Sequence, residues 1–269
     1  MYLDLTDTGI CQELLFNDIR EPLAIELVQK IIKPGDIIID IGANIGYYAL
    51  LEAKLTGGVG KVFALEPAAE NIKVLKKNVG LNNYRNIEIF QLAVGSKNGI
   101  LPFYLSKKCN WHSFLKSETL TPTIIDQVPT QVITLDSFIE NKPLPSFIRM
   151  DVEGYELEII KGMRKTLGSN KPLKILIEVH FHILKNKAKD LLMTLKKSGF
   201  RASAVTCEAN LLLVNEPPLI RNLFHFFSQR LDLDLYQAGH LNMDIDDLLS
   251  DKLLMGGKKG GVHILFERE

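Results

Sequence analysis

Cysteine, tryptophan and long apolar runs are all scarce in this sequence of 269 residues. The cysteines, Cys11, Cys109 and Cys207, are far apart and show no metal-ligand spacing. We therefore expect reduced structural thiols, not a disulfide framework or a zinc site. No apolar run approaches the roughly 18 residues that a membrane span requires. The N-terminal residues lack the basic and apolar parts of a signal peptide, which predicts a cytoplasmic protein without a membrane span.

An excess of charge of one sign is also absent. Lysine plus arginine and aspartate plus glutamate number 32 each. This balance removes the long-range attraction with which nucleic-acid-binding proteins collect their ligands, so we expect no nucleic-acid partner. The local group Lys73, Lys76 and Lys77 is typical of the solvent-facing side of a helix. With 46% hydrophobic residues the chain can bury a large single core.

Apolar strand-like runs alternate with helical patterns along the sequence. This alternation predicts an α/β fold, a doubly wound Rossmann-like sheet with helices on both faces. Residues 92–145 are rich in turn residues, and we expect them to lie over the carboxyl ends of the strands, where ligands bind in such folds. Within them, residues 99–105 and 128–135 resemble short extra strands. The main strands are predicted at 36–41, 61–66, 87–91, 146–151, 173–179 and 200–206, and helices at 21–32, 45–55, 68–79, 155–167 and 183–198.

The whole chain, 1–269, is predicted to form one domain with two additions. These are an N-terminal helical segment, 1–34, and an insertion, 215–259, while 35–214 and 260–269 form the core. The insertion interrupts a closing hairpin. It carries an apolar stripe at helical spacing, which could be a lid over the site, a homodimer contact, a lipid-facing surface or a helix packed on its own domain. The stripe consists of Leu219, Ile220, Leu223, Phe224, Phe227 and Leu231.

The run DIGANIGYYA, residues 40–49, places a glycine loop between a strand and a helix. Gly42 and Gly46 would let the backbone approach a bound molecule closely. The dinucleotide fingerprint has a further, middle glycine that admits a pyrophosphate, and here that position is not glycine. Asp40 would repel a pyrophosphate but suits a ligand that carries an ammonium and a sulfonium. The alternative is a tight strand-to-helix turn with no ligand.

Glu66 ends the next strand and is followed by Pro67, about twenty residues after the glycine loop. At this offset a carboxylate binds the ribose hydroxyls of an adenosine in doubly wound folds. Pro67 also looks like the start of a helix, where a negative charge is favourable in any case. The two interpretations are compatible.

Residues 149–163, RMDVEGYELEIIKGM, complete the set of motifs. Together with the glycine loop, Glu66-Pro67, LAVGSKNG at 92–99, TLDSFIE at 134–140 and ILIEVH at 175–180, they resemble the FkbM family of S-adenosylmethionine-dependent methyltransferases. The resemblance runs from about residue 16 to 205. It implies a class I methyltransferase sheet of seven strands, six of them parallel and the last antiparallel, with the helical insertion before that last strand. The insertion departs from the compact family pattern.

The resemblance also implies the residues that hold S-adenosylmethionine. Glu66 and Pro67 would lie at the ribose, Leu92 and Ala93 at the adenine, and Ser113 and Asp151 beside the cofactor. Trp111 lies next to His112 within residues 92–145. It either packs in the core or stacks on the acceptor. The residues implied around the methionine end are Asp40, Gly42, Ala43, Asn44, Gly46 and Tyr47.

An aliphatic hydroxyl needs a base or a metal before it attacks a methyl group. The catalytic candidates are Asp151, Glu178 and His180, with Glu153 and His182 nearby, because neighbouring strand ends meet at one edge of the sheet. Such a set could bind a divalent metal, or His180 could be a base that a carboxylate orients. We prefer the metal-free base. A third interpretation makes His180 a structural residue at a strand end.

The leading hypothesis is an O-methyltransferase that acts on a hydroxyl of a sugar, polyketide or other small metabolite. One alternative keeps the fold and cofactor but methylates nitrogen or a macromolecule. A second alternative is a non-catalytic module that binds the cofactor, and the presence of Asp151, Glu178 and His180 weighs against it.

Overall fold

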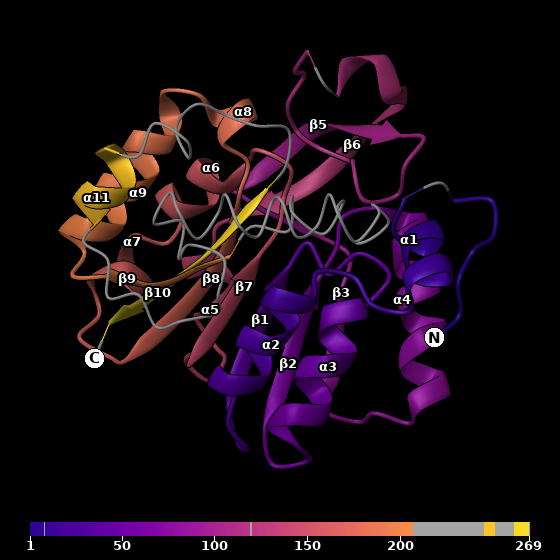
Figure 1. Cartoon of the computed structure of the whole chain (residues 1–269), viewed down its shortest axis with the longest axis horizontal. Helices are drawn as coiled ribbons and strands as arrows, with labels where there is room; N and C mark the ends of the chain where they lie inside the picture. Colours follow the sequence, from indigo (N-terminus) through magenta and orange to yellow (C-terminus); the bar gives the residue numbers. More distant parts are fainter. Residues whose placement is uncertain (8, 119, 207–244, 251–260, 269) are drawn as a thin grey trace, which may run out of the picture.

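A central sheet of seven strands forms the middle layer of the protein (Figure 1). The computed structural model describes residues 1–7, 9–118, 120–206, 245–250 and 261–268. The strand order is β3-β2-β1-β7-β8-β10-β9. The strands are β1 (Ile37–Ile41), β2 (Lys61–Leu65), β3 (Ile87–Phe90), β7 (Phe147–Met150), β8 (Leu173–Val179), β9 (Arg201–Thr206) and β10 (Val262–Arg268).

Six of these strands run parallel, and β10 runs antiparallel to both of its neighbours, β8 and β9. The predicted sheet, with an antiparallel last strand, is therefore confirmed. β10 does not lie at the edge of the sheet. It lies between β8 and β9, so β9 is the edge strand.

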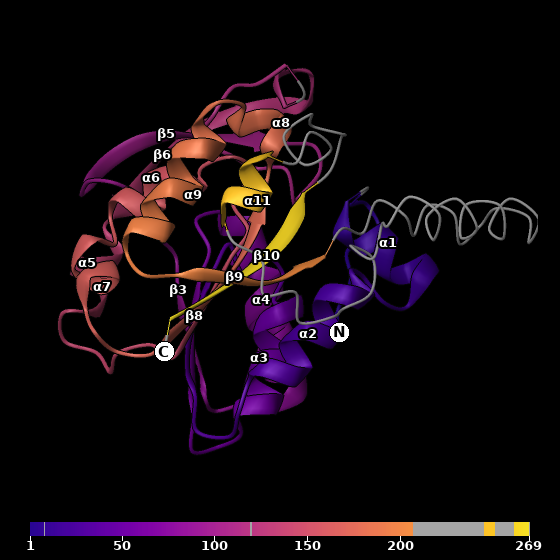
Figure 2. The same cartoon turned by 60° about the vertical axis from the view of Figure 1, so that its left-hand side comes forward.

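Helices cover both faces of the sheet, as Figures 1 and 2 show. Because side chains alternate along a strand, Ile38 packs with one set of helices and Ile39 with the other. One face carries α2 (Pro22–Ile31), α3 (Tyr47–Thr56) and α4 (Ala69–Asn82). The opposite face carries α5 (Leu135–Ile139), α6 (Glu156–Lys161), α7 (Arg164–Gly168), α9 (Lys187–Lys197) and α11 (Ile245–Ser250).

Two predicted helices are each divided in the structure. The predicted helix 155–167 becomes α6 and α7, because the chain passes so close to the neighbouring loop at Gly162 that a Cβ there would lie 2.0 Å from the Gly95 carbonyl oxygen. The predicted helix 183–198 becomes α8 (Phe181–Leu184) and α9, and Lys185 between them has a left-handed φ of 52°. A helical pattern in the sequence does not show either break.

The segment between β3 and β7 forms a small second sheet over the carboxyl ends of the main strands (Figure 1). It contains β4 (Ala93–Val94), β6 (Ile124–Ile133) and β5 (Gly99–Ser106), in that order across the sheet. The extra strands predicted here are therefore present, although β6 begins four residues earlier than expected. A 3₁₀ turn, η1 (Thr121–Thr123), precedes β6.

The N-terminal segment contributes α1 (Ile10–Asn17) and α2. The apolar stripe predicted at 219–231 lies outside the described residues. Of the predicted insertion, α11 is described, and it packs on α9 through Ile245 and Leu248 with an ion pair of 2.6 Å between Asp246 and Lys196. Within the part of the chain that the structure describes, no helix has the length and apolar character needed to cross a bilayer.

Candidate active site

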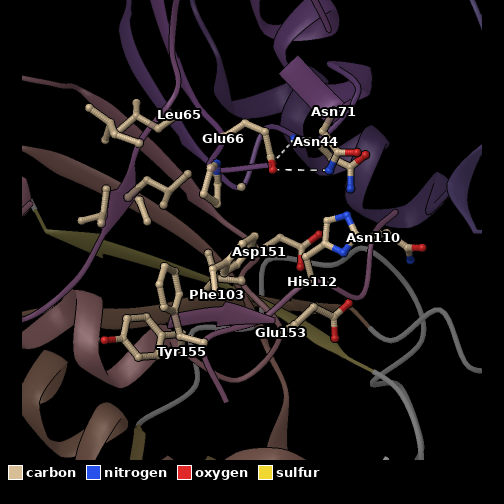
Figure 3. Close-up of a pocket in the computed structure, with 18 of the residues that line it drawn as sticks. Asn44, Leu65, Glu66, Asn71, Phe103, Asn110, His112, Asp151, Glu153 and Tyr155 are labelled. Carbon is tan, nitrogen blue, oxygen red and sulfur yellow. Dashed lines mark hydrogen bonds between the residues drawn. The ribbon is translucent and has the colours of Figure 1, made fainter. Parts of the chain in front are cut away.

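A cavity opens at the carboxyl ends of β1 and β2, beneath the small second sheet (Figure 3). Its wall is formed by five segments. These are the glycine loop, the turn after β2, the residues around the start of β4, the segment from β5 toward β6, and the turn after β7. Among the predicted site residues that line it are Gly42, Asn44, Glu66, Pro67, Leu92, Ala93 and Asp151.

The two loop glycines serve the packing of the protein itself. Gly42 has a φ of +83°, and a Cβ there would lie 2.0 Å from the carbonyl oxygen of Asp151. A Cβ on Gly46, whose φ is +92°, would lie 2.4 Å from Cδ1 of Leu75 in α4. We expected both positions to leave room for a ligand. The structure shows that glycine is also required there to bring the loop against the end of β7 and against α4.

Glu66 is only 4% exposed and borders the cavity. Its Oε2 accepts a hydrogen bond of 2.9 Å from the Asn44 backbone N–H, and its Oε1 accepts one of 2.8 Å from the Ala68 N–H. Burial raises the pKa of Glu66 to about 7, although these hydrogen bonds oppose the shift. The carboxylate is therefore held in a fixed orientation at the edge of the cavity.

The segment between β5 and β6 is joined to the glycine loop through the carbonyl oxygen of Cys109. That oxygen accepts hydrogen bonds of 3.1 Å from the side-chain amides of Asn44 and Asn71. The Cys109 thiol lies 3.1 Å from Oδ2 of Asp7, and Cys109 and Cys11 are both free thiols. Cys207 lies outside the described residues. These contacts fix one side of the cavity from three distant segments.

Asp40 does not reach the cavity. In β1 the side chains of Ile39 and Ile41 pack with one helical layer, so Asp40 between them points to the opposite face. There it is fully buried and forms an ion pair of 3.0 Å with Arg149, its direct partner across the strands. Our sequence argument gave this carboxylate a direct contact with the ligand. The alternation of the strand makes it a support beneath the loop instead.

Other predicted cofactor residues also lie outside the cavity lining. Ala43 is buried, and the Tyr47 hydroxyl makes hydrogen bonds with the backbone of Arg20. The Ser113 hydroxyl donates a hydrogen bond of 2.9 Å to the carbonyl oxygen of Glu153. Trp111 is partly buried and stacks under the Lys108 ammonium at 3.9 Å from the ring centroid. These side chains shape the loops around the site.

Aromatic side chains form the apolar wall of the cavity. The rings of Phe103 and Phe114 lie 4.7 Å apart, and those of Phe114 and Tyr155 lie 4.9 Å apart, measured between centroids. His112 also lines the cavity, and its Nδ1 accepts a hydrogen bond of 2.9 Å from the Ser106 N–H. Burial lowers the pKa of His112 to about 4, so it is neutral at pH 7.

The three catalytic candidates do come together. One ligand atom each from Asp151, Glu178 and His180 lies within 4.8 Å of the others. His180 is 4% exposed, and its Nδ1 lies 2.6 Å from Oε1 of Glu156 while its Nε2 lies 3.3 Å from Oε2 of Glu153.

The pKa values of these groups are shifted by burial and by one another. Burial raises the pKa of Asp151 to about 6 and that of Glu153 to about 8, with neighbouring carboxylates adding to both shifts. Burial alone would lower the pKa of His180, but Glu153 and Glu156 outweigh it and raise that pKa well above its usual value. Without a metal, the pKa of His180 therefore favours an imidazolium beside Glu153 and Glu156.

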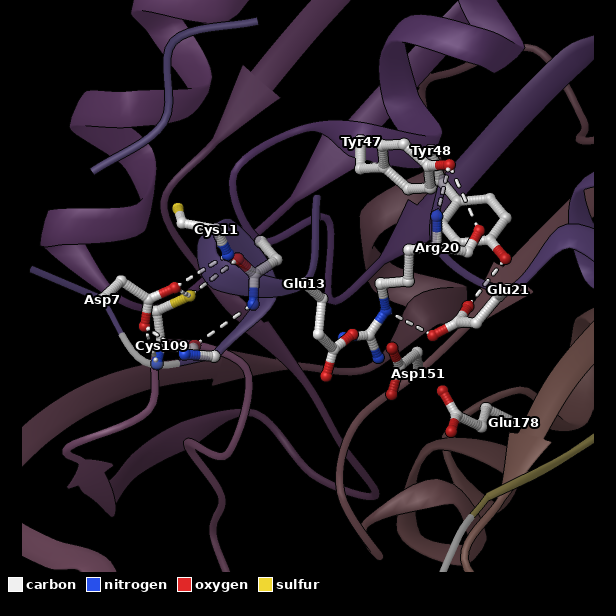
Figure 4. Close-up of polar contacts among 12 residues, drawn as sticks. Asp7, Cys11, Glu13, Arg20, Glu21, Tyr47, Tyr48, Cys109, Asp151 and Glu178 are labelled. Carbon is white, nitrogen blue, oxygen red and sulfur yellow. Dashed lines mark hydrogen bonds and ion pairs between the residues drawn. The ribbon is translucent and has the colours of Figure 1, made fainter. Parts of the chain in front are cut away.

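Residues from the two ends of the chain extend this cluster. Nε2 of His263, at the start of β10, lies 3.3 Å from Oε2 of Glu21 and 3.7 Å from Oε2 of Glu178. Arg20 is ion-paired with Glu21 and with Glu13, and Figure 4 shows its guanidinium directed toward the region between Glu13, Glu21 and Asp151. The acidic cluster thus joins β7, β8, β10 and the N-terminal segment.

The sequence reasoning did not identify Arg149, Glu156, Glu21 or His263 as site residues. Arg149 could have been found, because a single charge inside the otherwise apolar strand Phe147–Met150 must have a buried partner. Glu21 and His263 offered no such signal. They lie at opposite ends of the sequence, and the fold alone brings them together.

Comparison with known proteins finds methyltransferases. Hexuronic acid methyltransferase AglP of Haloferax volcanii is 28% identical to this chain over 166 residues, which cover 61% of this chain and 64% of that protein. Ribosomal protein L11 methyltransferase of Caldicellulosiruptor saccharolyticus is 44% identical over 69 residues, 26% of this chain and 22% of that protein. The matches thus span less than two thirds of the length of these curated relatives.

Among solved structures, methyltransferase FkbM from Methylobacillus flagellatus KT resembles this chain with a TM-score of 0.43 and 19% sequence identity. That likeness covers 64% of this chain and 44% of the other. Residues 40–202, more than half of the chain, match the sequence profile of the family described as "Methyltransferase FkbM domain". They include both the glycine loop and the Asp151, Glu178 and His180 set, and the chain therefore belongs to the FkbM methyltransferase family.

Proposed function

We propose that this protein is an S-adenosylmethionine-dependent O-methyltransferase that acts on a hydroxyl of a small molecule, of which a sugar is our first choice. Membership of the family supports the reaction class. The observation that carries the proposal is that a single cavity has Glu66 in its wall near the glycine loop and Asp151 in its wall near the end of β7. A nucleoside and an acceptor can therefore meet inside it.

The residues present fit the cofactor. Glu66 has acceptor oxygens at the cavity edge for ribose hydroxyls, and Leu92 and Ala93 offer an apolar slot with backbone amide and carbonyl groups for an adenine ring. Phe103 and Tyr155 add aromatic surface to the same wall. When bound, S-adenosylmethionine supplies a methyl group on a sulfonium leaving group, so the protein has mainly to align the acceptor oxygen and receive its proton.

Asp151 is the carboxylate that we assign to the acceptor. It lines the cavity, its side chain is 19% exposed, and Arg149 holds its Oδ2 at 3.2 Å. Glu153 lines the cavity from the same turn (Figure 3). An acceptor hydroxyl that donates a hydrogen bond to Asp151 would be oriented and relieved of its proton as the oxygen attacks.

His180 is less suited to this role than the sequence suggested. Both of its ring nitrogens face carboxylates, Glu156 on one side and Glu153 on the other, and only 4% of the residue is exposed. A buried imidazolium has no vacant nitrogen with which to accept a proton. We therefore transfer the proposed role of base from His180 to Asp151.

The acceptor class rests on the electrostatics of the site and on one relative. The crowding of Asp151, Glu153 and Glu178 would repel a free anion and favours a neutral hydroxyl compound. AglP, by its name, methylates a hexuronic acid; from this relative we take the sugar class and not the negative charge. The similarity to ribosomal protein methyltransferases covers 22% of those proteins and brings no support for a protein acceptor.

The first test is calorimetric titration with S-adenosylhomocysteine and with NAD, followed by methyl transfer from labelled S-adenosylmethionine to panels of neutral glycosides, uronic acids and polyketides. We expect binding of S-adenosylhomocysteine, none of NAD, and label on a neutral glycoside. Glu66→Ala should weaken binding by roughly 1–3 kcal/mol, whereas Glu88→Ala, on the exposed side of β3, should not. Tight binding of NAD with no response to S-adenosylhomocysteine would overturn the proposal.

A further inference from the structure

We propose that Asp151, Glu178 and His180 bind one divalent metal ion beside the cavity. Metal binding itself depends only on the residues below. Its catalytic consequence, described last, rests on the proposed function.

The spacing of the three groups suits a shared ion better than direct hydrogen bonds. Nε2 of His180 and Oε1 of Glu178 are 3.8 Å apart, which is too long for a hydrogen bond. Two ligand atoms that are each about 2.1 Å from one ion lie about 3.0–3.8 Å apart for bond angles of about 90–130°. The third group, Asp151, has a ligand atom within 4.8 Å of both.

His180 is supported as metal-ligating histidines usually are. Its Nδ1 lies 2.6 Å from Oε1 of Glu156, a carboxylate that is fully buried. Such a contact fixes the tautomer with hydrogen on Nδ1, and Nε2 would then bind a cation in place of its present ion pair with Glu153. Nε2 is the nitrogen that faces Glu178 and Glu153.

Glu178 has one carboxylate oxygen, Oε1, toward His180 and a second, Oε2, on the side of His263. The residue is nine-tenths buried, and its Oε2 makes no hydrogen bond to any described residue. That oxygen faces Nε2 of His263 at 3.7 Å, and His263 is held in turn by Glu21 at 3.3 Å. A buried carboxylate oxygen without a hydrogen bond is costly. Coordination of a cation by this carboxylate would remove that cost.

The surrounding charge also favours a cation. Six carboxylates that are less than a fifth exposed face two arginines and two histidines. Even with both imidazoles charged, Arg20 and Arg149 leave an excess of two negative charges if every carboxylate is ionised. A divalent ion would reduce that excess. The carboxylates are Glu21, Asp40, Asp151, Glu153, Glu156 and Glu178.

Carboxylate and imidazole ligands without a thiolate suit Mn²⁺, Mg²⁺ or Zn²⁺. Three protein ligands leave coordination positions on the ion open. Because Asp151 lines the cavity, these open positions would face the cavity. An acceptor hydroxyl bound there would lose its proton more easily, because a divalent ion lowers the pKa of a coordinated oxygen. The ion and Asp151 would thus act on the same acceptor oxygen.

The test is calorimetric titration of the chelator-treated full chain with Mn²⁺, with the electron paramagnetic resonance of Mn²⁺ as a second readout. We expect one Mn²⁺ per chain. Glu178→Gln and His180→Asn should each weaken binding about 100-fold or more, and His263→Gln, which acts through Glu178, about tenfold. Glu88→Gln, an exposed carboxylate in β3, is the matched control and should bind Mn²⁺ as the wild type does.

The wild-type titration decides the proposal even if a variant fails to fold. Absence of Mn²⁺, Mg²⁺ and Zn²⁺ binding to the folded wild type would overturn it, as would folded Glu178→Gln and His180→Asn variants with wild-type affinity. Titration with S-adenosylhomocysteine in chelator separates the two proposals. Cofactor binding without metal binding would refute the metal site alone, and metal binding without cofactor binding would refute the proposed function alone.

Discussion

Replacement of Gly42 by alanine tests whether this glycine serves the packing of the site. The backbone of Gly42 lies in the left-handed region, with a φ of +83°. An L-residue with a side chain in this conformation costs roughly 1–2 kcal/mol. The added Cβ would lie 2.0 Å from the Asp151 carbonyl oxygen, and contacts under 3.0 Å are essentially never found. The loop after β7 must therefore move by about 1 Å, and overpacking of this kind costs about 1–3 kcal/mol.

We expect Gly42→Ala to lower the free energy of unfolding by about 2–5 kcal/mol in total, measured by urea denaturation. Gly35→Ala is the matched control. Its φ is +90°, but the nearest atom to its Cβ, Cγ2 of Val59, is at an ordinary 3.9 Å. The control should therefore show the backbone cost alone. The difference between the variants isolates the contact with Asp151.

Methyl transfer provides the functional half of this test. A displaced Asp151 would no longer align the acceptor, so Gly42→Ala should reduce turnover by about 100-fold, while Gly35→Ala should leave it unchanged. Equal losses of stability in the two variants, or full activity of folded Gly42→Ala, would refute the packing argument. Gly42 would then be needed to leave space for a ligand, as we expected from the sequence.

Three further predictions concern the supports of the site. Arg149→Met should destabilise the fold by about 3–5 kcal/mol, because it leaves Asp40 buried and unpaired. Urea denaturation of the double variant Arg149→Met, Asp40→Asn should show that part of this stability is recovered, and no recovery would contradict the ion pair. The pKa of Glu66, raised by burial to about 7 from 4.5, means that the fold holds this proton more tightly than the unfolded chain does, so its contribution to stability falls as pH rises from 4.5 to 7. Affinity for S-adenosylhomocysteine should fall about tenfold per pH unit below 7 if the ribose needs the carboxylate, and a flat pH profile in calorimetry would exclude that need. Asn71→Ala should weaken S-adenosylhomocysteine binding about fivefold, for the loss of about 1 kcal/mol, because Asn71 donates hydrogen bonds to both Glu66 and the Cys109 carbonyl oxygen. Unchanged affinity would show that the orientation of Glu66 does not depend on Asn71.

The strand ends were predictable from the sequence because buried parallel strands are near-continuous apolar runs. Glu66 and Asp151 each follow such a run, and both reach the same cavity. Asp40 shows the limit of this reasoning. It lies within the strand and not after it, so the two-residue alternation decides its direction. Its partner, Arg149, depends on a register between strands that are 109 residues apart in sequence.

Contacts between distant segments account for the rest of the site. The Cys109 carbonyl oxygen meets Asn44 across 65 residues, and His263 meets Glu21 from the other end of the chain. Local periodicity carries no information about such pairs, because it describes only the face that an element buries. The roles assigned to Asp151, Glu178 and His180 remain predictions, although the fold brings the three together.

The position of β10 has a consequence for the order in which the sheet can assemble. Val262–Arg268 follows every other strand in sequence, yet it hydrogen-bonds on both sides, to β8 and to β9. Until it arrives, β8 and β9 each present an unpaired edge, and such edges attract other chains. Pairing of β10 with β8 also joins segments about 90 residues apart, which slows folding. We therefore expect any state of the chain in which β10 is unpaired to expose open strand edges that favour aggregation.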